Sequence, residues 1–162
     1  MGSIGDQHHA LVFGASGITG WAIVNAILNG YPSDSAFKKV TALTNRPLST
    51  EAAQWPKSGK LQVVSGIDLL AGDQSTLEAT MKEKVPGIET VTHVYFFAYI
   101  MDADPEKEIS INVDLLKRAV TAVERLAQSL KFVVLPTGTK VSVSSEQAPV
   151  QLTSRRRMVS IL

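Results

Sequence analysis

Three glycines spaced three residues apart separate an apolar run from a helical pattern. They are Gly14, Gly17 and Gly20, and the apolar run before them is 10–13. A glycine turn that joins a strand to a helix exposes backbone N–H groups at the helix N-terminus, where a diphosphate binds. Gly14 suits a tight turn, Gly17 leaves room for phosphate, and Gly20 allows the helix to pack close to the strand. The turn predicts a dinucleotide site; the alternative is a glycine-rich turn that binds nothing.

The end of the predicted second strand, 39–44, decides which dinucleotide would bind. A carboxylate there would accept a hydrogen bond from the ribose 2′-hydroxyl of NAD. The chain has Arg46 instead, whose guanidinium can donate to a 2′-phosphate. Asp34, the nearest acid upstream, lies in a predicted loop. The sequence favours NADP over NAD, and the alternative is that Arg46 is a solvated loop residue.

Strands and helices alternate along the chain, and these elements must position the residues above. Such alternation predicts a parallel sheet with right-handed crossovers, so the expected fold class is α/β, a Rossmann-type doubly wound sheet of about five strands. We expect an NADP-binding Rossmann domain at 1–140 and an irregular or disordered tail at 141–162, which is serine-rich and sustains no apolar period. The predicted strands are 10–13, 39–44, 61–64, 91–99 and 132–135, and the predicted helices are 18–28, 73–84 and one that Asp104 caps.

Composition and charge exclude several classes of protein. A net charge of +1 over 162 residues gives no electrostatic case for nucleic acid binding. The chain has no cysteine, and its three histidines lack the spacing of a metal site, so neither a disulfide nor a metal centre is expected. The longest apolar stretch, 91–101, is far shorter than the roughly 20 residues of a membrane helix. We therefore expect a cytoplasmic protein that binds neither nucleic acid nor a membrane.

Several motifs together resemble one enzyme family. Residues 14–20, 44–47 and 65–69 resemble the extended short-chain dehydrogenase/reductases, and 135–140 resembles their atypical subgroup of progesterone 5β-reductase, iridoid synthase and fungal relatives. The resemblance implies NADPH-dependent reduction of an enone or carbonyl substrate, of the kind found in secondary metabolism. It also implies cofactor contacts by Gly14, Ser16, Gly17, Ile18, Gly20, Asn45, Arg46, Asp68 and Leu69, with Phe97, Ala98, Thr137 and Gly138 on the nicotinamide side.

Only part of the catalytic machinery of this family is found in the sequence. Lys140 stands where the resemblance places the active-site lysine, in a Thr-Gly-x-Lys motif. Reduction also needs a proton donor at the substrate oxygen, normally a tyrosine whose pKa a lysine lowers. The last tyrosine is Tyr99, at the end of a predicted strand, where it is either a substitute donor or, more simply, a packing residue. Asn112 lies where related enzymes often have an asparagine, and packing or capping is its expected role.

The missing parts leave two functions open. Family members continue with further strands and a substrate lobe, so we expect a chain that is truncated at its C-terminus. The first hypothesis is an NADP(H)-binding reductase with Lys140 in its active site. The second is a degenerate or non-redox protein, either a binding module or a small isomerase or cyclase that reuses the cleft. An unpaired edge on the strand at 132–135 would also favour self-association.

Overall fold

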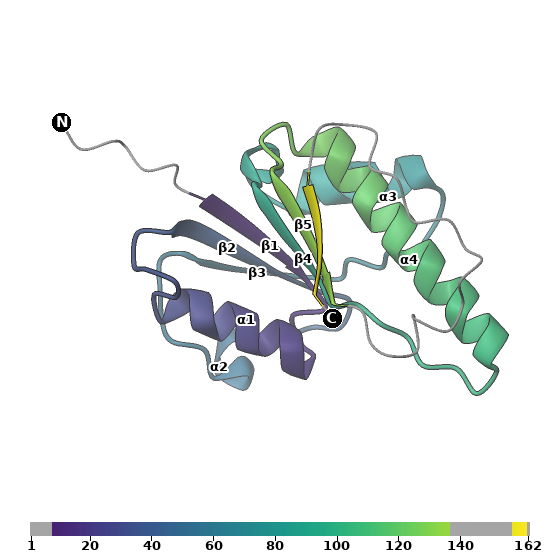
Figure 1. Cartoon of the computed structure of the whole chain (residues 1–162), viewed down its shortest axis with the longest axis horizontal. Helices are drawn as coiled ribbons and strands as arrows, with labels where there is room; N and C mark the ends of the chain where they lie inside the picture. Colours follow the sequence, from purple (N-terminus) through teal and green to yellow (C-terminus); the bar gives the residue numbers. More distant parts are fainter. Residues whose placement is uncertain (1–7, 137–156, 162) are drawn as a thin grey trace.

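Parallel strands form the central sheet of the protein (Figure 1). They are β1 (His8–Phe13), β2 (Phe37–Thr44), β3 (Leu61–Ser65), β4 (His93–Phe96), β5 (Phe132–Pro136) and β6 (Arg157–Ile161). The computed structural model describes residues 8–136 and 157–161. The strand order is β3-β2-β1-β4-β5-β6, and every neighbouring pair is parallel. The order of addition reverses beside β1, where doubly wound folds bind their ligands. The predicted α/β Rossmann-type class is confirmed.

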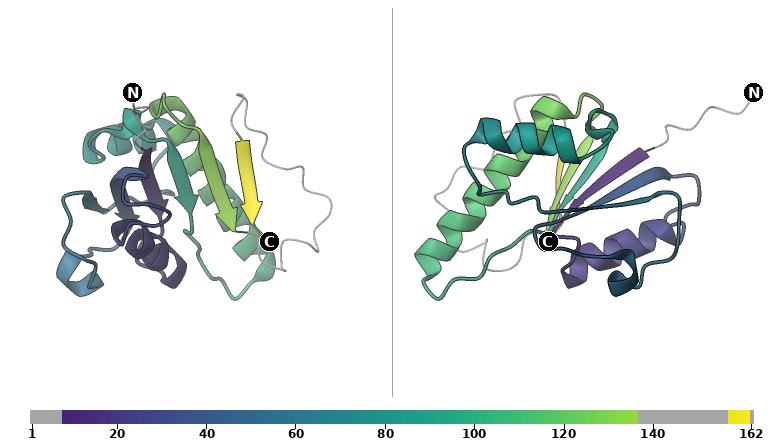
Figure 2. Two further views of the ribbon diagram at one scale, coloured as in Figure 1. Left: turned by 60° about the vertical axis from the view of Figure 1, so that its left-hand side comes forward. Right: turned by 180° about the vertical axis from the view of Figure 1, so that it is seen from behind.

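Helices cover both faces of this sheet. They are α1 (Ile18–Leu28), α2 (Thr50–Ala53), α3 (Gln74–Lys84) and α4 (Pro105–Leu126), with a short 3₁₀ turn at Ile88–Thr90. α1 and α2 lie on one face, and α3 and α4 lie on the other (Figures 1 and 2). The sequence analysis did not predict α2 or the 3₁₀ turn, because each is too short to show a helical period. None of the helices in the described ranges is both long and apolar enough to span a membrane.

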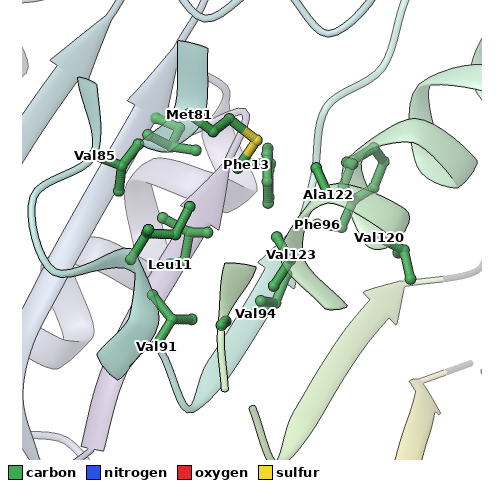
Figure 3. Packing of buried hydrophobic residues seen from close by; sticks show 14 of the residues in the cluster. Leu11, Phe13, Met81, Val85, Val91, Val94, Phe96, Val120, Ala122 and Val123 are labelled. Atoms are coloured by element: carbon green, nitrogen blue, oxygen red, sulfur yellow. The ribbon is translucent and has the colours of Figure 1, made fainter. Parts of the chain in front are cut away.

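The two faces of β1 belong to two separate hydrophobic cores. Leu11 and Phe13 pack in the core that contains residues of α3 and α4 (Figure 3). Ala10 and Val12 pack in the core beneath α1. All four side chains are at most 2% exposed. A strand buried on both faces is apolar at every position, which explains its uninterrupted apolar sequence. The strand that leads into the glycine turn is therefore enclosed on both sides.

The fourth strand is shorter than predicted. β4 ends at Phe96, whereas the apolar pattern predicted a strand over 91–99. Phe97 N still donates to the carbonyl of Phe13 at 3.0 Å, but β1 ends at that residue, so the pairing that would extend β4 stops there. Tyr99 consequently lies in a loop and is 58% exposed. The expectation that Tyr99 packs at a strand end is wrong.

The segment 141–162 is not irregular throughout. Its residues 157–161 form β6, which pairs with β5 along the whole of that strand, while 137–156 lie outside the described residues. A five-residue run is too short to show an apolar period, and the open edge of β5 supplies the hydrogen-bond partners that it needs. The edge of β5 that was expected to be free is therefore paired. Self-association through the new edge, β6, stays a prediction.

Candidate functional site

The glycine turn between β1 and α1 is closely packed against its surroundings. Gly14 has a φ of +72°, a left-handed conformation that favours glycine. A Cβ on Gly14 would come within 2.6 Å of the Phe97 backbone, and a Cβ on Gly20 would come within 2.3 Å of the Gly14 oxygen. Neither backbone atom can move aside as a flexible side chain would. The tight turn predicted at Gly14 and the close helix contact predicted at Gly20 are both confirmed.

The N-terminus of α1 opens toward solvent. Its N-cap residue is Gly17, which has no side chain to accept from the first N–H groups, and the first turn of α1 contains no acid. A Cβ on Gly17 would meet only the Gly14 oxygen, at 3.4 Å. Ser16 is exposed, and Ile18 is 92% exposed. The helix thus presents N–H groups that it leaves without partners, together with the positive end of its dipole, to an incoming anion.

The loop after β2 carries Asn45 and Arg46 beside this turn. Ala15 N donates to the carbonyl of the penultimate residue of β2 at 3.1 Å, which joins the turn to the end of that strand. Both Asn45 and Arg46 are exposed, and the Arg46 guanidinium has no hydrogen bond or ion pair within residues 8–136. Asp34 follows the C-terminal end of α1, at the far end of that helix from the turn. The first residues after β2, which would face a ribose, therefore include a cation and no carboxylate.

Two hydroxyl groups join the loops after β2 and β3. Thr44 Oγ1 donates to the Arg46 carbonyl at 2.7 Å and lies 3.1 Å from Ser65 Oγ. Ser65 Oγ in turn accepts from Leu48 N at 3.1 Å. These bonds hold the backbone around Arg46 against the end of β3. The sequence analysis included both residues in the family motifs but gave them no role; a hydroxyl at the last position of each of two strands was the available signal.

The remaining predicted contacts differ in exposure. Phe97 and Ala98 are half-buried, and their backbone lies directly against Gly14, beside the glycine turn. Asp68 is exposed, and its carboxylate accepts from Leu70 N at 2.9 Å. Leu69 is 6% exposed and belongs to the core with α3 and α4, so its side chain is not displayed toward a ligand. Thr137, Gly138 and Lys140 lie outside the described residues.

Tyr99 is held by α4 and not by a lysine. Its phenol donates a hydrogen bond to the Glu108 carboxylate, and this bond raises the pKa of Tyr99 above its ordinary value. The other oxygen of Glu108 accepts from Asp102 N at 3.2 Å. A tyrosine that donates protons in a reductase needs a lowered pKa. The surroundings of Tyr99 act in the opposite direction.

Asn112 fixes the loop that follows β4. Its Nδ2 donates to the Ile100 carbonyl at 2.7 Å, and its Oδ1 accepts from Ile100 N at 2.9 Å. Nδ2 also donates to the Glu108 carbonyl at 2.8 Å. An ion pair of 2.8 Å between Lys107 and Asp102 fastens the same loop to α4. Asn112 lies within α4 and caps neither of its ends; its side chain instead holds the loop that follows Phe97 to Tyr99.

Proteins of known family resemble this chain in sequence. A family model described as the PRISE-like Rossmann-fold domain matches residues 10–152. The short chain dehydrogenase ausT of Aspergillus calidoustus is 42% identical over 134 residues, which are 80% of this chain and 32% of the relative. The short chain dehydrogenase sirQ of Leptosphaeria maculans is 40% identical over 131 residues, 80% of this chain and 33% of the relative. The chain thus spans about a third of the length of these curated relatives.

Solved structures share the fold. The DesIV double mutant (dTDP-glucose 4,6-dehydratase) of Streptomyces venezuelae, with NAD and DAU bound, superposes with a TM-score of 0.60 at 18% identity, covering 86% of this chain and 42% of that chain. Gre2 of Candida albicans gives a TM-score of 0.57 at 16% identity, covering 80% of this chain and 36% of that chain. At these identities the likeness concerns the fold alone.

Proposed function

The chain belongs to the PRISE-like Rossmann-fold domain family, among short-chain dehydrogenase/reductase-like proteins, and from that premise we propose that it binds NADP(H) at the carboxyl edge of its sheet. Family membership supports a nicotinamide dinucleotide as the ligand. The preference for the phosphorylated form is our inference from Arg46. The reaction that the site would serve is reduction of an enone or carbonyl group on a small molecule, as in secondary metabolism.

A single observation carries the proposal, namely the uncapped start of α1 beside an exposed guanidinium. Gly17 leaves the first N–H groups of the helix to solvent, and no acid in the first turn competes with an incoming phosphate. The N-terminus of a helix stabilises a negative charge by its free donors and its dipole. Arg46 lies in the adjoining loop and offers a planar fork of donors that matches a phosphate. These residues fit a diphosphate joined to a 2′-phosphorylated ribose.

Each predicted contact has a distinct task in this proposal. The N–H groups of residues 18–20, which α1 leaves without partners, would hold the diphosphate, and Asn45 and Arg46 would hold the 2′-phosphate. Asp68 would face the adenine, with Leu69 contributing backbone only, because its side chain is buried. The backbone and half-buried side chains of Phe97 and Ala98 would line the site of the nicotinamide ring. The bound NADPH supplies a hydride; Thr137, Gly138 and Lys140 keep the roles that the family resemblance implies.

One observation favours a second function, in which the dinucleotide is bound without redox chemistry. Among the tyrosines of the described part, Tyr99 donates to Glu108, and burial raises the pKa of Tyr95. Tyr31 follows α1 at the end away from the glycine turn. None of the three is placed as a lysine-activated proton donor. NADPH oxidation with an enone substrate, abolished by Lys140→Ala, would exclude the non-redox alternative.

Titration calorimetry with NADPH and NADH tests nucleotide binding directly. We expect NADPH to bind more tightly than NADH. Arg46→Ala is expected to weaken NADPH binding by about tenfold or more and to change NADH binding little, because a charged hydrogen bond contributes about 1.5–3 kcal/mol. Gly17→Val places a side chain in the space above the helix start and is expected to weaken both nucleotides. Gly59→Ala is the matched control, since a Cβ on Gly59 meets no atom within 4 Å. Folded protein that gives no heat with either nucleotide would overturn the proposal.

A further inference from the structure

Two tryptophans join the first turn of α1 to the loop that follows Arg46. Trp21 Nε1 donates to the carbonyl of Ala53, the last residue of α2, at 2.7 Å. Trp55 Nε1 donates to the carbonyl of Trp21 at 3.3 Å. Ala53 and Trp55 are buried in the core beneath α1, at 7% and 5% exposed. We call these three residues the tryptophan clasp, in which each indole N–H bonds the backbone of the other element.

On the α1 side, the clasp lies one turn from the start of the helix. Trp21 N donates to the Gly17 carbonyl at 2.8 Å, which is the first hydrogen bond of α1. A displacement of Trp21 would therefore displace the N–H groups that face the proposed diphosphate. Trp21 and these N–H groups are separated by a single helical turn, which rises only about 5.4 Å, so they move together.

On the loop side, the clasp and the end of β2 hold the backbone around Arg46 from both directions. At the end of β2, Thr44 Oγ1 donates to the Arg46 carbonyl at 2.7 Å. Farther along, Ser49 caps α2 by accepting from Ala52 N at 3.1 Å, and Ala53 accepts from Trp21. Residues 45–60 form a long connection between β2 and β3. Long connections move unless they are anchored, and the clasp is the anchor in the middle of this one.

We propose that the tryptophan clasp sets nucleotide selectivity by fixing the loop of Arg46 relative to the start of α1. This inference rests on the proposed function. A guanidinium discriminates in favour of a 2′-phosphate only when it is held at the right separation from the site that grips the diphosphate. Trp21 and Trp55 are positioning residues, because they act through Arg46. Removing either indole N–H therefore weakens binding of the phosphorylated nucleotide more than binding of the unphosphorylated one.

The test compares dissociation constants for NADPH and NADH in the full chain. Trp21→Phe and Trp55→Phe keep an aromatic ring and remove the indole N–H. The loss of one such hydrogen bond is expected to lower the NADPH preference by about three- to tenfold, chiefly through weaker NADPH binding. In an Arg46→Ala background, Trp21→Phe is expected to leave the preference unchanged, since the two residues act as one unit. Val120→Ala, in the core on the other face of the sheet, is the control that lowers stability without changing the preference.

The outcomes separate the clasp from the proposed function. If the unsubstituted protein binds neither nucleotide, the proposed function fails. If it prefers NADPH through Arg46 but both phenylalanine variants keep that preference, the clasp is overturned alone. A phenylalanine variant that loses thermal stability with an unchanged ratio of dissociation constants also overturns it. Trp55→Phe removes only the longer of the two bonds, at 3.3 Å, and provides a milder variant if Trp21→Phe does not fold.

Discussion

At the amino end of the sheet, His9 is enclosed between two threonines, whereas at the carboxyl end no side chain caps the N-terminus of α1. His9 is 3% exposed. Its Nδ1 lies 2.9 Å from Thr90 Oγ1, and its Nε2 lies 2.8 Å from Thr41 Oγ1. Gly17, in contrast, offers the helix start no cap. The difference teaches that polar groups at one end are satisfied within the fold, while those at the other end stay free for the proposed dinucleotide.

Aromatic rings reinforce the closed end. His93 packs against His8, with ring centroids 4.4 Å apart, and against Phe132, with ring centroids 5.1 Å apart. Its Nδ1 lies 2.9 Å from Thr92 Oγ1. Burial lowers the pKa of His93 to about 4, and the charges of His8 and Lys131 act in the same direction. The amino end therefore depends on histidines that stay neutral.

The largest expected effect comes from filling the closely packed part of the carboxyl end. Gly20→Val would place a Cβ 2.3 Å from the Gly14 oxygen, so the helix must move away from the strand. We expect a loss of about 3 kcal/mol or more in the free energy of unfolding, the upper range for overpacking. Urea denaturation measures it, with Gly59→Ala as the neutral control. A variant within 1 kcal/mol of the parent, on the scale of ordinary surface substitutions, would contradict this packing.

Acid is expected to weaken the amino end selectively. Burial, followed by the charge of Lys39, lowers the pKa of His9 from 6.5 to about 4. Because the unfolded chain takes up protons first as pH falls, the stability from neutral His9 is full above pH 6.5 and is lost progressively down to about pH 4. We expect His9 to account for up to about 3 kcal/mol over that window, since each unit of pKa difference corresponds to about 1.4 kcal/mol.

Urea denaturation at pH 7, 5.5 and 4 measures this loss. His9→Gln, which cannot take up the proton, is expected to remove about half of the dependence while costing some stability at pH 7. The rest remains because the pKa of His93 is also lowered to about 4, so that His93 titrates in the same window. The lowered pKa values of Asp73 and Asp102 place their titration below their ordinary acidic range, so they contribute little in the same window. Equal free energies of unfolding at pH 7 and pH 4 would contradict the role of His9.

The smallest expected effect concerns the loop between β4 and α4. Asn112→Ala removes both hydrogen bonds to Ile100 and the bond to the Glu108 carbonyl. The loop is partly exposed, so we expect a loss of about 1–2 kcal/mol and faster limited proteolysis between residues 97 and 104. Asp114→Ala, at an exposed position of the same helix, is the matched control. Equal cleavage rates for the two variants would show that Asn112 does not hold the loop.

The features that follow from neighbouring residues could be predicted from the sequence. β1 was predicted because both of its faces are buried, and the glycine turn was predicted because its conformation and close contacts require glycine at Gly14 and Gly20. The Asp104 cap of α4 was predicted for the same reason, since capping is local.

The features that depend on distant partners could not be predicted. β4 ends where its partner β1 turns away, and β6 forms because β5 offers an edge. The tryptophan clasp joins residues more than thirty positions apart. The bond from Tyr99 to Glu108 needs the loop after β4 to fold back on α4. None of these contacts leaves a period or a motif in the sequence, because each depends on how the elements pack.

The enclosure of β1 has a consequence for isotope exchange. Its amides bond to strands on both sides and lie between two cores, while Ser16, Gly17 and the first residues of α1, only a few positions later, are exposed. Deuterium uptake is therefore expected to change from the slowest in the chain to among the fastest within a few residues. A bound nucleotide would slow deuterium uptake by the exposed amides and leave uptake by the β1 amides unchanged. The β1 amides therefore serve as an internal reference for occupancy of the neighbouring site.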